Sequence, residues 1–209
     1  SQFEFVGGAY GFYNGGTRGG AGTATLLNRG NFGLDDGDDY DVVMFTKHQL
    51  DLVAWESLHV NFGEYFFDLG NSYELDEFFV VDGLDLVFAT TNGRVQGVEG
   101  AWLAQHNAAI GDQVIMTGRG LSRELGGTLQ WSGYTYAHDA VIDATQYATI
   151  FDNNHYIIEF DQYSARGEQF DSGSPLLDYL HPDTVVGWAE SVFESNGYGA
   201  RTVFGRVDD

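Results

Sequence analysis

The sequence predicts an all-β protein, either a barrel or a sandwich, from three observations. Short apolar runs rich in Val, Ile, Phe and Tyr, which fit a pleated and half-buried surface, are separated by segments of Gly, Asn and Asp. Long apolar stripes at the i, i+3, i+4 spacing of a helix are scarce. Aromatic residues make up 15% of the chain and there are only two prolines, a composition that favours strands over helices.

The expected strands are the apolar runs bounded by turn-forming residues. In chain order they are residues 23–27, 41–45, 78–81, 84–89, 113–117, 156–160, 184–188 and 202–207. Two brief stretches have a helical pattern, residues 48–55 and 143–149. No internal repeat stands out.

The best candidate for a domain boundary is the polar, Gly-rich stretch 90–100 (TTNGRVQGVEG) near the middle of the chain. We therefore expect an N-terminal barrel over residues 1–95 and a C-terminal barrel over residues 96–209. The Gly-rich stretch 15–22 (GGTRGGAG) lacks the Gly-Lys-Ser/Thr that closes a P-loop, so we expect a flexible connection into the first strand.

The charge of the chain excludes several partners. With 31 acidic and 9 basic residues the net charge is −22, which leaves no basic face for nucleic acid or for an anionic membrane surface. Lys47 is the only lysine, and Asp outnumbers Glu about two to one. Such surfaces resemble those of proteins from salt-saturated environments, where molar salt screens the self-repulsion over about 3 Å. The alternative is an ordinary acidic surface.

The absence of cysteine excludes disulfides and cysteine-ligated metal centres. No apolar run approaches the roughly 18 residues that a membrane span requires. The chain starts at Ser1 without a methionine and without the apolar core of a signal peptide, so we expect a processed product or a fragment of a longer chain.

One acidic segment, residues 34–41 (LDDGDDYD), has the clustered carboxylates that suit hard cations. Its spacing does not match an EF-hand, because Gly37 comes too early and no glutamate closes the loop. A solvated hairpin loop is the simpler interpretation. We expect neither a metal nor a cofactor.

The stretch 170–175 (FDSGSP) predicts a tight turn that exposes the hydroxyl of Ser172. Such a turn can also direct backbone N–H groups at one point, as an acyl-transfer nucleophile requires. It is not the elbow of an α/β hydrolase, because Phe170 stands where that motif has glycine. Taken alone, it is equally compatible with a simple Gly-Ser turn.

A serine nucleophile needs a base, and the base needs a carboxylate. Among the six histidines, His48 follows an apolar strand and opens a helical pattern. Asp85 leads into the apolar stretch 85–89 (DLVFA), where a carboxylate is costly unless it has a partner.

The order His48, Asp85, Ser172, with long gaps, resembles the trypsin/chymotrypsin-like serine peptidases. The family has an apolar pair before Thr-Ala-Ala-His or Asn-Asn-His, and this chain has VMFTKH. DLVFA resembles the family's Asp-Ile/Leu-Ala-Leu-Leu, and FDSGSP resembles Gly-Asp-Ser-Gly-Gly/Ser-Pro. Further similar segments cover nearly the whole chain, including a strand pair expected to open the second barrel from residues 110–118 and 126–129. The others are residues 6–8, 20–27, 185–187 and 202–207.

This resemblance implies the chymotrypsin-like fold, with two six-stranded antiparallel barrels and the site in the cleft between them. His48 would take the proton of Ser172 and deliver it to the leaving amine, and Asp85 would orient His48. The amides of Ser172 and Phe170 would form the oxyanion hole, although the family has glycine where Phe170 stands. The loss of one oxyanion donor costs about 10²–10³-fold in rate.

The resemblance also places residues near a substrate pocket. Arg166, six residues before Ser172, stands where the family sets the pocket floor and would favour an acidic substrate side chain, unless it points to solvent. Glu190 would pair with Arg166 or, as the simpler expectation, be solvated. His138 and His155 line the pocket or, more simply, sit on strands.

The sequence thus predicts a serine endopeptidase adapted to high salt, acting on a peptide or protein substrate, with no nucleic-acid partner and no membrane span. We expect an extracellular or virion-associated location, alone or within a larger assembly. The alternative is a catalytically weak or inactive module on the same fold, such as a virion-shell or surface protein. A third interpretation is an all-β module that binds carbohydrate or cations through exposed aromatics and aspartates.

Overall fold

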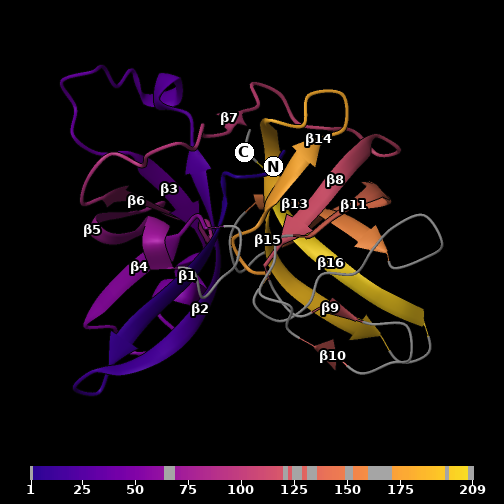
Figure 1. Cartoon of the computed structure of the whole chain (residues 1–209). Helices are drawn as coiled ribbons and strands as arrows, with labels where there is room; N and C mark the ends of the chain where they lie inside the picture. The colour runs from indigo at the N-terminus through magenta and orange to yellow at the C-terminus, as the bar shows by residue number, and fades with distance from the viewer. Residues whose placement is uncertain are drawn as a thin grey trace.

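A computed structural model describes residues 2–63, 69–119, 122–123, 129–130, 136–148, 153–159, 171–195 and 198–206. These residues form two β units that lie side by side, the first drawn in indigo to magenta and the second mainly in orange to yellow (Figure 1). The all-β prediction is confirmed.

The first unit is a closed antiparallel barrel with the strand order β1-β2-β3-β6-β5-β4. Its strands are β1 (Val6–Tyr13), β2 (Thr17–Leu27), β3 (Val42–Phe45), β4 (Ser57–Asn61), β5 (Ser72–Val80) and β6 (Val87–Thr91). β3 is buried along its whole length, as expected for a short apolar run inside a small barrel.

The expectation of a flexible connection at residues 15–22 is wrong, because most of this stretch belongs to β2. The chain turns at residues 14–16, where φ is positive (48°, 76° and 111°), and pairs with β1 from Thr17 onward. Bare backbone in the hairpin makes room for an indole ring: a Cβ on Gly11 would lie 2.6 Å from Trp55 Cε3. An aromatic ring packed on glycine replaces the usual alternation of apolar side chains here.

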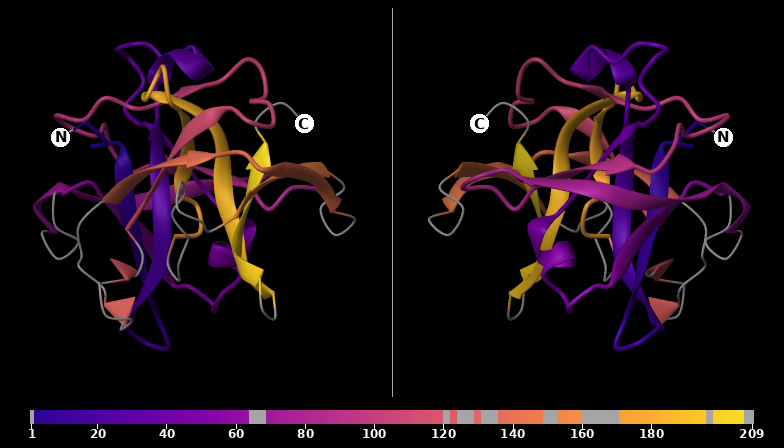
Figure 2. Two further views of the ribbon diagram at one scale, coloured as in Figure 1. Left: turned by 90° about the vertical axis from the view of Figure 1, so that its right-hand side faces the viewer. Right: turned by 90° about the vertical axis from the view of Figure 1, so that its left-hand side faces the viewer.

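The second unit is a half-barrel, whose curved strands are seen from two sides in Figure 2. Its sheet has the order β11-β8-β14-β15-β16-β13-β12, with β7 parallel to β15. Its strands are β7 (Trp102–Leu103), β8 (Gln113–Gly118), β11 (Tyr136–Val141), β12 (Ala144–Ala148), β13 (Asn153–Glu159), β14 (Pro175–Asp178), β15 (Thr184–Ser195) and β16 (Tyr198–Arg206). A separate two-stranded sheet pairs β9 (Ser122–Arg123) with β10 (Leu129–Gln130). The described part of this unit is therefore an open sheet rather than the closed barrel that the resemblance implied.

One expectation for the second unit is corrected, and another falls mostly outside the described residues. The stretch 143–149 is not a helix, because residues 144–148 form β12 and pair with β13. Thr and Tyr suit a strand once a partner edge is present. In the described part of the chain β8 pairs with β11 and β14, and its expected pairing with residues 126–129 falls mostly outside that part. Of that segment only Leu129 is described, and it belongs to β10.

In the described part of the chain, helical structure is confined to single turns: η1 (Arg29–Phe32), α1 (Lys47–Leu50) and η2 (Leu69–Asn71). The expected helix over residues 48–55 is confirmed only in its first turn. Within the described residues, no helix has the length and apolar character needed to cross a bilayer.

The two units share a hydrophobic core. The second unit contributes Ile115, Leu177, Val185 and Trp188 to the cluster that fills the first barrel. Arg119, which follows β8, donates from Nε to the Val6 carbonyl at 3.1 Å and from NH2 to the Gly63 carbonyl. Burial lowers the pKa of Arg119 to about 10. The predicted domain boundary at residues 95 and 96 falls in the connection between β6 and β7 and stays a prediction.

Candidate active site

His48 is the second residue of α1, the helical turn that follows β3. The N–H of Thr46 donates to Gln49 Oε1 at 2.8 Å, which closes the start of the turn. Gln49 Nε2 donates to the carbonyls of Ala21 and Thr23 on β2, at 2.7 and 3.0 Å. The buried amide of Gln49 therefore anchors the turn that carries His48 to the barrel wall.

Asp85 lies just before β6, with its side chain only 3% exposed. Its Oδ1 accepts the backbone N–H of His48 at 2.9 Å, and its Oδ2 lies 2.6 Å from His48 Nδ1. The indole Nε1 of Trp188 on β15 donates to the Asp85 carbonyl at 3.1 Å. Both carboxylate oxygens are hydrogen bonded, which is the condition for burying them without a large cost.

Ser172 lies in the turn that leads into β14, and this turn is held from both units. The N–H of Gly173 donates to the carbonyl of Ala189 on β15 at 2.9 Å, and the Ser172 carbonyl accepts the N–H of Thr23 on β2 at 3.0 Å. The position of the serine is thus tied to the first barrel that carries His48 and to the second unit that carries the turn.

The three side chains form one continuous series of contacts. Ser172 Oγ lies 2.8 Å from His48 Nε2, and the opposite ring nitrogen faces Asp85. With its proton on Nδ1, the imidazole offers Nε2 as an acceptor for the serine hydroxyl. The His48 side chain is 44% exposed, so a substrate has access to it. This geometry can support proton transfer from serine and nucleophilic attack on an acyl group.

Gly173 cannot carry a side chain in this arrangement. Its φ is +84°, and a Cβ would lie 2.2 Å from the Thr23 carbonyl oxygen and 2.5 Å from Gln49 Oε1. The sequence offers one signal for Gln49, since Thr46 and Gln49 have the T-x-x-Q spacing of a capping box. No motif singles out Thr23 or Trp188, which reach the site only through the pairing of distant strands.

The remaining predicted site residues lie elsewhere or outside the described part. Arg166, Phe170 and the side chain of His138 lie outside the described residues. The simpler expectation for Glu190, a solvated carboxylate, is wrong: its side chain is 4% exposed and its Oε2 lies 2.6 Å from Nε2 of His155 on β13. Burial raises the pKa of Glu190 and the charge of Asp85 adds to the shift, whereas contact with His155 opposes it.

Two other polar pairs lie in the first barrel: one adjoins His48 in the chain, and the other is a serine–histidine contact. Lys47, beside His48, pairs with Asp51 one turn along, and this hydrogen bond raises the pKa of Lys47. Ser57 Oγ lies 3.1 Å from His59 Nε2, a second serine–histidine contact in the first barrel. Burial lowers the pKa of His59.

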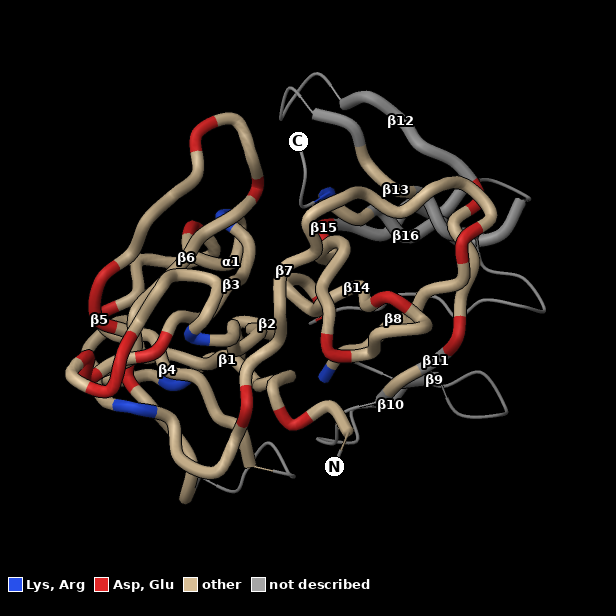
Figure 3. Tube along the Cα trace, turned by 90° about the horizontal axis from the view of Figure 1, so that it is seen from above, with Lys and Arg blue, Asp and Glu red and all other residues tan. Residues whose placement is uncertain are grey.

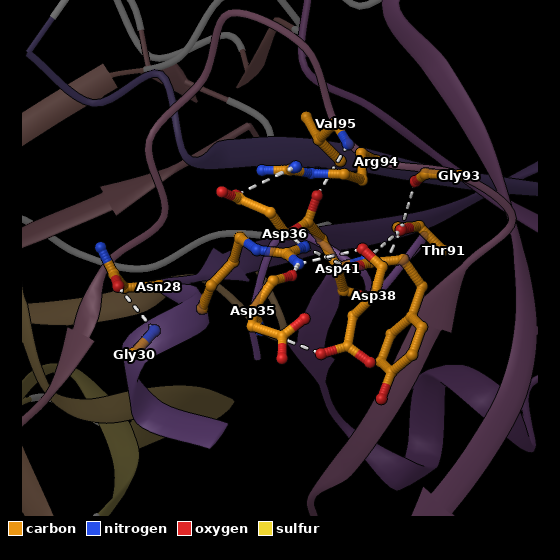
Figure 4. A network of polar contacts seen from close by, with 12 residues as sticks. Asn28, Gly30, Asp35, Asp36, Asp38, Asp41, Thr91, Gly93, Arg94 and Val95 are labelled. Atoms are coloured by element: carbon orange, nitrogen blue, oxygen red, sulfur yellow. Dashed lines mark hydrogen bonds and ion pairs between the residues drawn. The ribbon is translucent and has the colours of Figure 1, made fainter. Parts of the chain in front are cut away.

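Acidic residues are spread over the loops of both units, with few basic residues between them (Figure 3). The acidic loop 34–41 is organised around Arg29. Its NH1 donates to Asp41 Oδ1 at 2.8 Å and to the Tyr40 carbonyl at 2.6 Å, and its NH2 donates to the Asp38 carbonyl at 3.0 Å (Figure 4). The guanidinium group of Arg29 thus binds oxygen atoms of this loop. No group of three or more acidic or histidine side chains that could hold a metal occurs in the described residues.

No protein-family model matches the chain, and no curated protein matches its sequence. Solved structures do match it in fold. The Rv3671c protease from M. tuberculosis in its active form is similar with a TM-score of 0.66 and 18% identity, over 98% of this chain and 77% of that chain. A serine-to-alanine mutant of Rv3671c in its inactive form gives 0.62 and 17%, over 98% and 82%.

The scabies mite inactivated protease paralogue S-I1 is similar with a TM-score of 0.71 and 16% identity, over 99% of this chain and 90% of that chain. At such identities the likeness concerns the fold alone. The chain has the chymotrypsin-like double β-barrel fold of these proteases, with a closed first barrel and a half-barrel second unit.

Proposed function

We propose that the chain is a serine endopeptidase that works through His48, Asp85 and Ser172. The observation that carries the proposal is the series of contacts from Ser172 Oγ to His48 Nε2 (2.8 Å) and from His48 Nδ1 to Asp85 Oδ2 (2.6 Å). A scaffold protein has no need for three polar side chains in this order, one of them buried and two of them accessible.

In this mechanism His48 takes the Ser172 proton as Oγ attacks the carbonyl carbon of the scissile peptide bond. Asp85 keeps the imidazole in the required tautomer and stabilises the imidazolium that forms. His48 then protonates the leaving amine, and a water molecule repeats the sequence on the acyl-enzyme. The amide of Ser172 is one donor for the developing oxyanion, with the amide of Phe170 as the proposed second donor.

We further propose that the protein is a cysteine-free member of the bacterial and haloarchaeal type and works in high salt. The net charge of −22 with a single lysine supports this. A peptide or protein substrate, an extracellular or virion-associated location and membership of a larger assembly belong to the same proposal.

The second candidate is a protease-fold module with weak or no activity, for example a virion-shell or surface protein. Phe170 favours it, because it replaces the glycine of the oxyanion loop. The fold is compatible with both candidates, since function resides in the site rather than in the architecture.

Labelling with a fluorophosphonate probe in molar KCl tests the proposal. We expect the wild type to be labelled and Ser172→Ala to remain unlabelled. Ser57→Ala is the matched control, because Ser57 also contacts a histidine and its loss should leave labelling intact. Well-folded wild type that takes up no probe would exclude the peptidase and favour the inactive module.

Salt adaptation has a separate test. The thermal midpoint of unfolding should rise steeply with KCl concentration into the molar range, because screening relieves the repulsion among surface carboxylates. A flat response would reject this part of the proposal and leave the peptidase proposal untouched.

A further inference from the structure

Glu190 and His155 form a second imidazole–carboxylate pair, inside the second unit. Their side chains are 4% and 2% exposed, and Glu190 Oε2 lies 2.6 Å from His155 Nε2. The other oxygen of Glu190, Oε1, is buried without a hydrogen-bond partner among the described residues. A buried carboxyl group depends on its close polar contacts, and the 2.6 Å contact with His155 is the one that holds Glu190 in place among the described residues.

The pair joins two strands that are not neighbours. β13 and β15 flank β16, and Gly205 on β16 is in register with His155 on one side and with Trp188 on the other. A Cβ on Gly205 would lie 2.2 Å from Trp188 Cζ2 and 2.8 Å from Glu190 Oε1. The absence of a side chain at Gly205 therefore lets the imidazole and the carboxyl group meet across β16.

Glu190 occupies a bulge in β15 that directly follows two residues in contact with the candidate active site. The bulge lies where the register between β15 and β16 shifts, just after Ala189. Trp188 Nε1 donates to the Asp85 carbonyl at 3.1 Å, and the Ala189 carbonyl accepts the N–H of Gly173 at 2.9 Å. One short segment of β15 thus touches both the backbone of Asp85 and the serine turn.

We propose that Glu190, held by His155, is a positioning residue for the candidate active site. The buried pair pins the bulge of β15, and the pinned bulge fixes the backbone of Asp85 and the turn of Ser172. A displacement of about 1 Å at such a site can cost on the order of 100-fold in rate. The proposal rests on the proposed function for its kinetic readout, but its structural readout does not require turnover.

Three variants test the proposal in molar KCl. Glu190→Ala removes the acceptor, and Glu190→Gln keeps an oxygen that can accept the N–H of His155. Glu77→Ala is the matched control, because it truncates an exposed glutamate on β5, far from β15 in the chain. The rate constant of fluorophosphonate labelling should fall about 10- to 100-fold in Glu190→Ala, stay within roughly 3-fold of wild type in Glu190→Gln, and remain unchanged in the control.

The second readout is the downfield proton NMR signal of the hydrogen bond between His48 Nδ1 and Asp85, assigned by its loss in His48→Phe. It should shift or broaden in Glu190→Ala and keep its position in Glu190→Gln. If the wild type takes up no probe, the peptidase proposal fails, and this signal still decides the positioning role.

Two results would overturn the positioning role. One is a wild-type labelling rate and an unmoved NMR signal in folded Glu190→Ala. The other is an equal loss in Glu190→Gln and Glu190→Ala, which would separate the effect from the bond to His155. Should Glu190→Ala fail to fold, His155→Phe fills the imidazole volume without its donor and is expected to give the same loss.

Discussion

Among the described residues, two imidazole–carboxylate pairs have the same 2.6 Å separation and different surroundings. In the pair of His48 and Asp85 the imidazole is 44% exposed and its far nitrogen faces Ser172. In the pair of His155 and Glu190 both side chains are almost fully buried. The distance between imidazole and carboxylate therefore does not distinguish the two pairs. What distinguishes them is access from solvent and the presence of a third group, Ser172, on the second ring nitrogen of His48.

The largest expected effect comes from the same substitution in both pairs. His48→Phe should reduce probe labelling by about 10⁴-fold or more, since the proposed mechanism assigns the serine proton to His48. His155→Phe should reduce it by only about 10- to 100-fold, because it acts through the position of Glu190. Labelling rate constants in molar KCl measure both. Losses of similar size would mean that the two pairs do not differ in kind.

A glycine also lies beside each of the two sites: Gly173 follows Ser172 in the chain, and Gly205 faces Glu190, and a methyl group added to each would meet different atoms. Gly173→Ala would drive a Cβ into the backbone oxygen of Thr23 at 2.2 Å with φ at +84°, so we expect a loss of about 3 kcal/mol or more in unfolding free energy. Gly205→Ala would meet the Trp188 ring and Glu190 Oε1, with an expected loss of about 1–3 kcal/mol.

Gly93→Ala is the control for both substitutions, since no heavy atom lies within 4 Å of the added Cβ. We expect its unfolding free energy to stay within about 0.5 kcal/mol of wild type. Denaturant unfolding in molar KCl measures all three variants. If Gly205→Ala matched this control, the Glu190 bulge would be looser than the packing indicates.

The two pairs differ too in how far the sequence predicts them. His48, Asp85 and Ser172 each stand in a short local motif, so their order along the chain was enough to group them. His155 and Glu190 have no such motif, because their contact depends on the register of β13 and β15 against β16. Periodicity within one segment carries no information about that register.

The lack of information about strand pairing also explains the errors in the fold prediction. The apolar runs that became β3 and β8 were predicted, since burial requires a continuous apolar stretch. The β1–β2 hairpin was not fully predicted, because glycines packed on Trp55 give no alternation of apolar side chains. Residues 144–148 form a strand because they pair with the edge of β13. The sequence of a single segment does not show which other segment it will pair with.

A smaller effect is the pH dependence of stability that Glu190 contributes. The pKa of Glu190 is raised above its ordinary value of 4.5. Between that value and the folded pKa, the carboxyl group is therefore protonated in the folded protein and ionised in the unfolded chain. Stability from this group is complete below the ordinary value and is lost as pH rises through the folded pKa. The wild type should therefore lose stability relative to Glu190→Gln as pH rises from about 4.5.

Thermal midpoints in molar KCl across this pH interval measure the difference between wild type and Glu190→Gln. Glu77→Gln is the control, because it makes the same change of side chain at an exposed position on β5. The charges facing Glu190 are those of His155, Asp85 and His48. A constant or reversed difference would contradict the assignment of Glu190 as a carboxyl group whose ionisation is disfavoured by burial.

The smallest expected effect concerns Lys47, the cation next to the exposed pair. Its ammonium group is engaged by Asp51 on the same helical turn, and molar salt screens exposed charges beyond about 3 Å. Lys47→Gln should therefore change the labelling rate constant by less than about 2-fold, although the residue adjoins His48. A much larger change would mean that the charge of Lys47 acts on the imidazole despite its partner. The reactivity of the exposed pair would then depend on its surface neighbours as well as on the buried contacts that position it.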